Sequence, residues 1–215
     1  MKNQRNYSPL DRLCLGIDQT LKSICGKTIP ARRPYPAHNT PEGTLTAEQR
    51  KHSAALMRIN HAGEVCAQAL YHGQGLVSRL PLVREKMLEA AKEEGDHLAW
   101  CSQRITELGS HTSYLNPFWY MGSFIIGLSA GLISDEYSLG FLAETELQVV
   151  QHLEKQLDLL PIEDEKSHLI LQQMQKDEAQ HRDDALQAGA AELPSFFKSL
   201  MHFTSKMMVK VTYWI

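Results

Sequence analysis

The sequence predicts an all-α protein, a bundle of four long helices. Two observations carry this prediction: apolar residues recur every three or four positions over most of the chain after residue 46, and no alternating run of β-branched residues indicates a sheet. The 215 residues, 43% of them hydrophobic, are enough for one domain with a sizeable core. A formal net charge of −3, without a long basic block, gives no indication of nucleic-acid binding.

The first 45 residues are predicted to hold a short helix followed by an extended linker. Leucines and isoleucines from Leu10 to Ile24 recur at helical spacing, and four prolines lie between Pro30 and Pro41. The start of the chain has no apolar stretch behind basic residues, so we expect no secretory signal and a bacterial cytoplasmic location. The four cysteines match no zinc or disulfide framework, which favours reduced and buried thiols.

Residues 46–190 are predicted to form the four-helix bundle. The second helix follows Pro81, Pro161 stops the third, and Gly189 offers a C-cap to the fourth. The predicted helices span about 46–76, 82–108, 135–160 and 163–188. A further amphipathic helix is expected from about residue 195, within a C-terminal segment of residues 191–215.

Ionisable side chains fall on faces that the periodicity predicts to be buried. In the second helix Glu94 and His97 lie inside an apolar stripe, and in the fourth helix Glu178 and His181 align with apolar residues. In the first helix Glu64 has no other formal charge among its face neighbours. A buried carboxylate is costly unless it is paired or bound to a metal ion, and we expect no Lys or Arg on the stripes of the second and third helices.

The third helix offers two glutamates, and its periodicity selects one of them. Glu146 lies at the centre of an apolar stripe that runs from Leu139 to Leu157. Glu144 instead shares its face with polar residues that include Lys155. The sequence therefore predicts that Glu146 is buried and that Glu144 lies at the surface.

The candidate residues form a repeated pattern, a lone Glu followed by Glu-x-x-His. The lone Glu precedes the next Glu by 30 residues in the first half, from 64 to 94, and by 32 in the second, from 146 to 178. One Glu-x-x-His match is expected by chance, and a third match, Glu165 to His168, lies on a charged helix start where we expect it to be solvated. Two buried matches, each preceded by a buried Glu, are far more specific.

The chemistry of this pattern favours a pair of metal ions. Four carboxylates carry about −4, which two divalent ions balance, and oxygen-rich sites with one imidazole per metal suit iron or manganese better than zinc. Such a site in a four-helix bundle is typical of ferritin-like carboxylate proteins. We therefore expect a ferritin-like bundle that binds two irons, with additional helices that interact with a membrane.

A segment without Asp, Glu, Lys or Arg, residues 108–134, separates the two halves of the repeat. Its apolar part, 118–133, has 16 residues with three glycines, which is shorter than the roughly 20 that span a bilayer. Two interpretations stay open: contact with a membrane interface, which Trp119 and Tyr120 would suit, or a crossover connection buried against the bundle. The basic amphipathic C-terminal segment could likewise lie on an anionic surface or pack on a partner subunit.

Three motifs resemble those of the demethoxyubiquinol hydroxylases of ubiquinone biosynthesis. They are NHAGE at 60–64, EEGDH at 93–97 and DEAQH at 177–181, and the resemblance extends from about residue 56 to about residue 184. In that family the matching residues are the iron ligands, and no catalytic residue beyond them is carried over. The implied ligands are Glu64, Glu94, His97, Glu146, Glu178 and His181.

The resemblance implies a membrane-associated monooxygenase. Because the apolar segment is too short and too rich in glycine to span a bilayer, we expect the protein to lie peripherally on the cytoplasmic face of the bacterial cell membrane. It would use two Fe ions (Fe²⁺/Fe³⁺) per chain and dioxygen to hydroxylate the ring of a 2-polyprenyl-3-methyl-6-methoxy-1,4-benzoquinol, with electrons from NADH or from the quinol. The sequence leaves open whether the chain forms a homo-oligomer or binds other proteins of ubiquinone biosynthesis. Two other classes also stay open: an iron-storage or ferroxidase protein of the same fold, and a non-enzymatic membrane-binding helical module that binds no metal.

Overall fold

The computed structural model describes residues 31–215, and within this range it contains six helices and no strand. The all-α prediction is confirmed, while the helix predicted between Leu10 and Ile24 lies outside the described residues. The helices are α2 (Ala47–Val77), α3 (Pro81–Glu107), α4 (Asn116–Ile133), α5 (Asp135–Leu159), α6 (Glu165–Gln187) and α7 (Ser195–Thr212).

The helices begin where the sequence supplies caps. Thr46 and Gln49 form a reciprocal capping box at the start of α2, with bonds of 3.1 Å and 2.9 Å between each side chain and the other's backbone N–H. Pro81 opens α3, where a missing N–H costs nothing. The helix predicted from residue 163 begins two residues later because the Asp164 side chain accepts from the backbone N–H of Ser167 and caps it.

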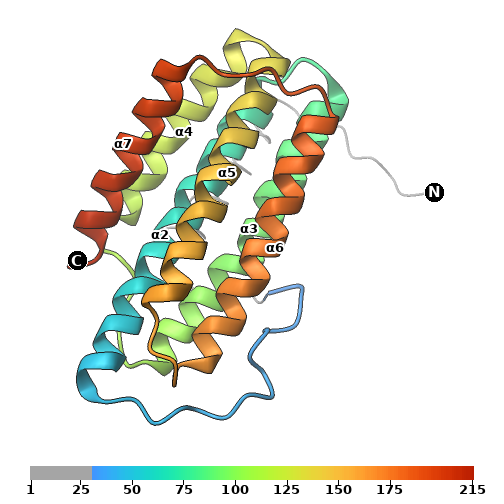
Figure 1. The fold of residues 1–215 in the computed structure, drawn as a ribbon. Helices are drawn as coiled ribbons and strands as arrows, with labels where there is room; N and C mark the ends of the chain where they lie inside the picture. The colour runs from blue at the N-terminus through green and yellow to red at the C-terminus, as the bar shows by residue number, and fades with distance from the viewer. Residues whose placement is uncertain (1–30) are drawn as a thin grey trace.

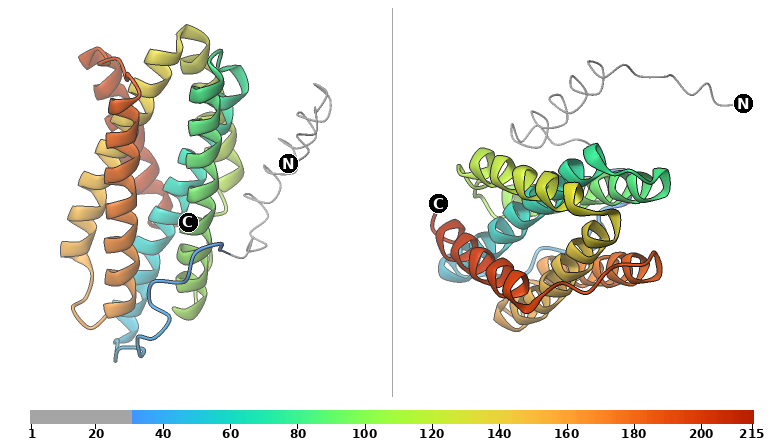
Figure 2. Two further views of the ribbon diagram at one scale, coloured as in Figure 1. Left: turned by 90° about the vertical axis from the view of Figure 1, so that its right-hand side faces the viewer. Right: turned by 90° about the horizontal axis from the view of Figure 1, so that it is seen from above.

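Four helices form the bundle as two hairpins, α2 with α3 and α5 with α6 (Figure 1). Helix α4 runs along α2 and joins the end of α3 to the start of α5, so it is the crossover between the hairpins (Figures 1 and 2). Helix α7 returns beside α5 and α2 (Figure 2). Thus α4 and α7 are added to the same side of a bundle whose centre stays enclosed by the other four helices.

Small residues let α4 approach α2 closely. A Cβ atom added to Gly127 would lie 2.2 Å from the carbonyl oxygen of Leu70, and one added to Gly73 would lie 2.4 Å from that of Phe124. The opposite side of α4 is exposed. The crossover interpretation is confirmed for the face that packs on α2. The other face presents apolar side chains outward, and its contact with a membrane interface stays a prediction. No helix within the described residues is long and apolar enough to cross a membrane.

One sequence prediction is wrong: α3 does carry a buried cation on its apolar face. Arg104, two turns after His97, is fully buried. Its guanidinium bonds Asp164 at 2.6 Å and Glu42 at 2.7 Å. These partners come from the start of α6 and from the segment before α2, so the local stripe gave no sign of them. The charge of Arg104 is balanced there and does not offset the carboxylates at the bundle centre.

The close approach of α4 and α2 gives the first prediction. Gly127→Ala should lower the free energy of unfolding by about 1–3 kcal/mol, because the added methyl group meets backbone that cannot move alone. Gly122→Ala is the matched control in the same helix, since nothing lies within 4 Å of its added Cβ. It should be neutral or stabilising by up to about 1 kcal/mol. Chemical unfolding followed by circular dichroism measures both, and equal effects would contradict the close packing.

Candidate metal centre

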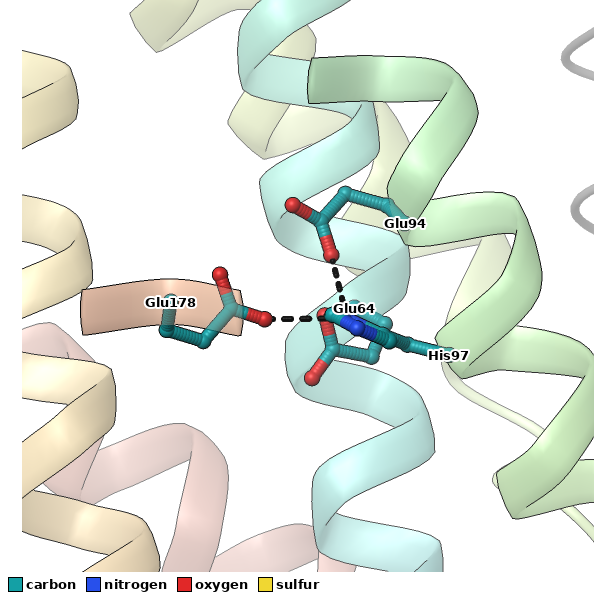
Figure 3. Close-up of side chains that lie close together, drawn as sticks. All are labelled: Glu64, Glu94, His97 and Glu178. Carbon is teal, nitrogen blue, oxygen red and sulfur yellow. Dashed lines mark hydrogen bonds and ion pairs between the residues drawn. The ribbon is translucent and has the colours of Figure 1, made fainter. Parts of the chain in front are cut away.

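The six predicted residues lie together at the bundle centre, in two overlapping groups. Within each group, one ligand atom from every residue lies within 4.8 Å of all the others. Glu94 and Glu178 belong to both groups and so stand between them. The groups are Glu64, Glu94, His97 and Glu178, drawn in Figure 3, and Glu94, Glu146, Glu178 and His181. Each of the four bundle helices therefore contributes, as the repeated sequence pattern predicts.

All six side chains are buried, and the most exposed of them, His181, retains 9% exposure. Burial and then the charge of Glu94 raise the pKa of Glu64 well above its ordinary value, and burial and then Glu178 do the same for Glu146. Burial acts against the charge on His181, but its hydrogen bonds to Glu178 and Glu93 raise its pKa to about 12. These shifts favour the protonated form of each group, whereas a bound divalent ion would favour the carboxylates and the neutral imidazole.

Two observations test whether these residues fit metal ions. Glu94 Oε1 is buried without a hydrogen-bond partner, which is costly for a carboxylate oxygen. Within residues 31–215, no Lys or Arg forms an ion pair with Glu64, Glu94, Glu146 or Glu178. A donor set of four carboxylates and two imidazoles suits two divalent ions with a preference for oxygen ligands. The residues fit a di-iron centre in charge and donor type.

Both histidines point one ring nitrogen into the cluster and the other at an outer carboxylate. Nδ1 of His97 lies 2.9 Å from Glu178 Oε1, while its Nε2 lies 3.0 Å from Asp177 Oδ2. Nδ1 of His181 lies 3.0 Å from Glu178 Oε2, while its Nε2 pairs with Glu93. A carboxylate that accepts from Nε2–H fixes the ring and leaves the Nδ1 lone pair for a metal.

Sequence reasoning missed these two outer carboxylates. Asp177 and Glu93 each directly precede the Glu of a Glu-x-x-His motif, and each pairs with the histidine of the other motif. The signal was present as two adjacent acidic residues in both halves of the repeat. Tyr71 was also missed: it is fully buried and donates its hydroxyl proton to Glu146 Oε1.

The two competing acidic candidates lie away from the cluster. Glu144 is half-buried, not fully at the surface as predicted, because α7 covers it. It lies 3.9 Å from Lys198 Nζ and bonds Gln148 at 2.9 Å. Glu165 is exposed, and Nδ1 of His168 bonds the backbone carbonyl of Asp164, so the third Glu-x-x-His match takes no part in the centre.

A four-helix bundle that encloses four glutamates and two histidines in this arrangement is of the ferritin-like class. The family described as "Ubiquinone biosynthesis protein COQ7" matches residues 51–212, and the chain belongs to this family. The resemblance inferred from the three motifs is thereby confirmed.

The chain is also similar over nearly its whole length to proteins named 3-demethoxyubiquinol 3-hydroxylase. The protein from Stutzerimonas stutzeri is 54% identical over 215 residues, 100% of both chains. That from Pseudomonas fluorescens is 53% identical over 215 residues, again 100% of both. That from Nitrosococcus oceani is 52% identical over 211 residues, which cover 98% of this chain and 99% of the relative.

The structure predicts different effects on iron binding for the two glutamates of α5. Glu146→Ala should lose iron, because it removes a carboxylate from the buried cluster, whereas Glu144→Ala should keep the full complement. Each apoprotein is loaded anaerobically with ferrous iron, desalted and submitted to elemental analysis, with circular dichroism to confirm the fold. Iron retained by Glu146→Ala and lost by Glu144→Ala would overturn the assignment.

Proposed function

We propose that this chain is a 3-demethoxyubiquinol 3-hydroxylase, a monooxygenase of ubiquinone biosynthesis. The main support is the buried Glu/His cluster, in a chain that belongs to this family and is similar to named hydroxylases over its whole length. The substrate would be a 2-polyprenyl-3-methyl-6-methoxy-1,4-benzoquinol. One atom of dioxygen enters its ring and the other leaves as water, which requires two electrons, from NADH or from the quinol.

The cluster would hold two iron ions. Glu64 and His97 would bind one, Glu146 and His181 the other, and Glu94 and Glu178 lie between the two groups. When bound, ferrous ions would supply the redox chemistry that activates dioxygen.

The protein groups around that centre fix it and keep it dry. The outer carboxylates Asp177 and Glu93 hold the histidine rings, and the Tyr71 hydroxyl holds Glu146. Burial of all the ligands excludes bulk water from the reacting atoms.

Iron storage is the second candidate, because it also begins with ferrous iron and dioxygen in a bundle of this class. The exterior favours the hydroxylase. Helices α4 and α7 lie on the same side of the bundle (Figures 1 and 2). Both helices expose large apolar side chains. These are Phe118, Ile125, Leu132 and Ile133 of α4 and Phe196, Leu200, Phe203 and Met207 of α7. An amphiphilic quinol substrate accounts for such a surface, whereas a storage shell does not require it.

The reaction itself is tested with labelled oxygen. Reduced, iron-loaded protein is given a demethoxyubiquinol and ¹⁸O₂, and the product is analysed by mass spectrometry. One labelled atom should enter the quinol ring, and Glu144→Ala should retain the reaction while Glu146→Ala loses it. Iron mineralisation with no oxygen inserted into the quinol under either reductant would favour the storage function instead.

We further propose that the apolar side formed by α4 and α7 binds the membrane surface peripherally. The support is its exposed aromatic and aliphatic residues together with the exposed Lys206 and Lys210 on α7, a combination that suits an anionic interface. A prenylated substrate would be reached from that surface.

Vesicle binding tests this peripheral contact. Phe203→Glu, in the exposed face of α7, should weaken binding to anionic phospholipid vesicles by roughly tenfold or more, because an apolar ring is replaced by a charge. Ile162→Glu is the control, since Ile162 is 87% exposed in the loop between α5 and α6. High salt should release the protein. Equal binding by both variants, or a protease-protected fragment around residues 118–133, would contradict the proposal.

A further inference from the structure

The segment before α2, residues 31–46, brings an arginine to the outer side of one half of the cluster. Arg33 Nη2 donates to Asp177 Oδ2 at 2.8 Å, and its Nε donates to Asp96 Oδ2 at 3.2 Å. The guanidinium lies 4.7 Å from the centroid of the Trp100 ring. Asp96 is itself held by the backbone N–H of Arg32 at 2.6 Å. Arg33 therefore joins α3 to α6 through two carboxylates and an aromatic face.

Arg33 and its partner Asp177 both contact His97, one of the candidate metal ligands. The Asp177 oxygen that Arg33 contacts also lies 3.0 Å from Nε2 of His97. Arg33 Nη2 is 3.1 Å from the same nitrogen, so both groups converge on one carboxylate oxygen. Arg33 restricts Asp177, and Asp177 restricts the His97 ring, whose Nδ1 faces the cluster.

The other half of the repeat has no such direct contact, and the Arg33 charge reaches its outer carboxylate, Glu93, only at longer range. His181 is held by Glu93, whose side chain is 37% exposed, against 14% for Asp177. Across the described part of the chain, no Lys or Arg forms an ion pair with Glu93. The repeat supplies equivalent ligands and outer carboxylates to both halves, and Arg33 from outside the repeat makes the halves different.

We propose that Arg33 is a positioning residue for the His97 half of the centre alone, so that the two metal positions differ in affinity. The proposal rests on the proposed di-iron centre. Groups that orient a metal-binding histidine typically contribute 10–100-fold in metal affinity. An arginine suits this position because its planar fork bridges two carboxylates while its face stacks on an indole, which a lysine ammonium cannot do.

The test is an anaerobic titration of full-length apoprotein with ferrous iron, which resolves two binding steps. Arg33→Ala should weaken one step by about 10–100-fold and leave the other unchanged. Arg33→Lys keeps the charge but not the fork, and should weaken the same step. Arg32→Ala is the matched control: it removes the same charge from the adjacent residue, which is 57% exposed and lies 3.8 Å from Asp96. Both of its binding steps should remain as in the wild type.

Single-site backgrounds locate the effect. In the His181→Ala background, which keeps the His97 position, Arg33→Ala should lower the affinity for the remaining iron by about the same 10–100-fold. In the His97→Ala background, Arg33→Ala should leave the affinity for the remaining iron unchanged. Circular dichroism and thermal unfolding of each apoprotein report folding, and if Arg33→Ala loses helicity, Arg33→Lys carries the comparison.

The outcomes separate this inference from the proposed function. A wild type that binds no iron would refute the di-iron centre itself. A wild type that binds two irons while Arg33→Ala changes neither step, or both equally, would refute only the role of Arg33. An effect that persists in the His97→Ala background, or wild-type affinities in Arg33→Lys, would refute it as well.

Discussion

Four glutamate carboxylates meet in the centre of a helical bundle, where an ionised group has lost most of its hydration. Their mutual repulsion in a medium of low dielectric is not relieved by an arginine or lysine, because none within residues 31–215 forms an ion pair with these four carboxylates. Either protons or metal ions must neutralise them. Burial raises the pKa of Glu64 and of Glu146, which favours the first solution, and the donor set fits the second.

Much of the remaining architecture can be understood as support for that cluster. The two hairpins are interlocked because each supplies the outer carboxylate for the histidine of the other, Asp177 for His97 and Glu93 for His181. The segment before α2 joins α3 to α6 at two points. Arg33 does so near the cluster, and Glu42 does so farther along α3, where it pairs with Arg104 of α3 and Lys166 of α6. Helices α4 and α7 then add an apolar side to the outside of the bundle (Figure 2).

Helix periodicity was sufficient to predict the bundle and the burial of Glu146 in α5, because a buried face repeats within a single helix. It could not reveal interactions that depend on distant segments. Arg104 lies on the apolar stripe of α3, and its burial depends on Glu42 and Asp164, which are 62 and 60 residues away in sequence. Arg33 meets Asp177 across 144 residues, and Glu144 becomes half-buried only because α7 returns over it. The close packing of α4 on α2 could not be predicted either, because the role of its glycines depends on the α2 backbone beside them.

The most direct test of this account is calorimetric titration of ferrous iron into the anaerobic apoprotein, repeated in buffers of different ionisation enthalpy. Metal must displace the protons retained at Glu64 and Glu146, whose pKa values burial raises, and at His181, whose pKa is raised to about 12. We expect two ions per chain, net proton release, and an affinity for iron that increases as the pH rises, because those protons are then more easily lost. Binding of fewer than two ions, or binding without proton release, would contradict the claim that the buried carboxylates form a di-iron centre.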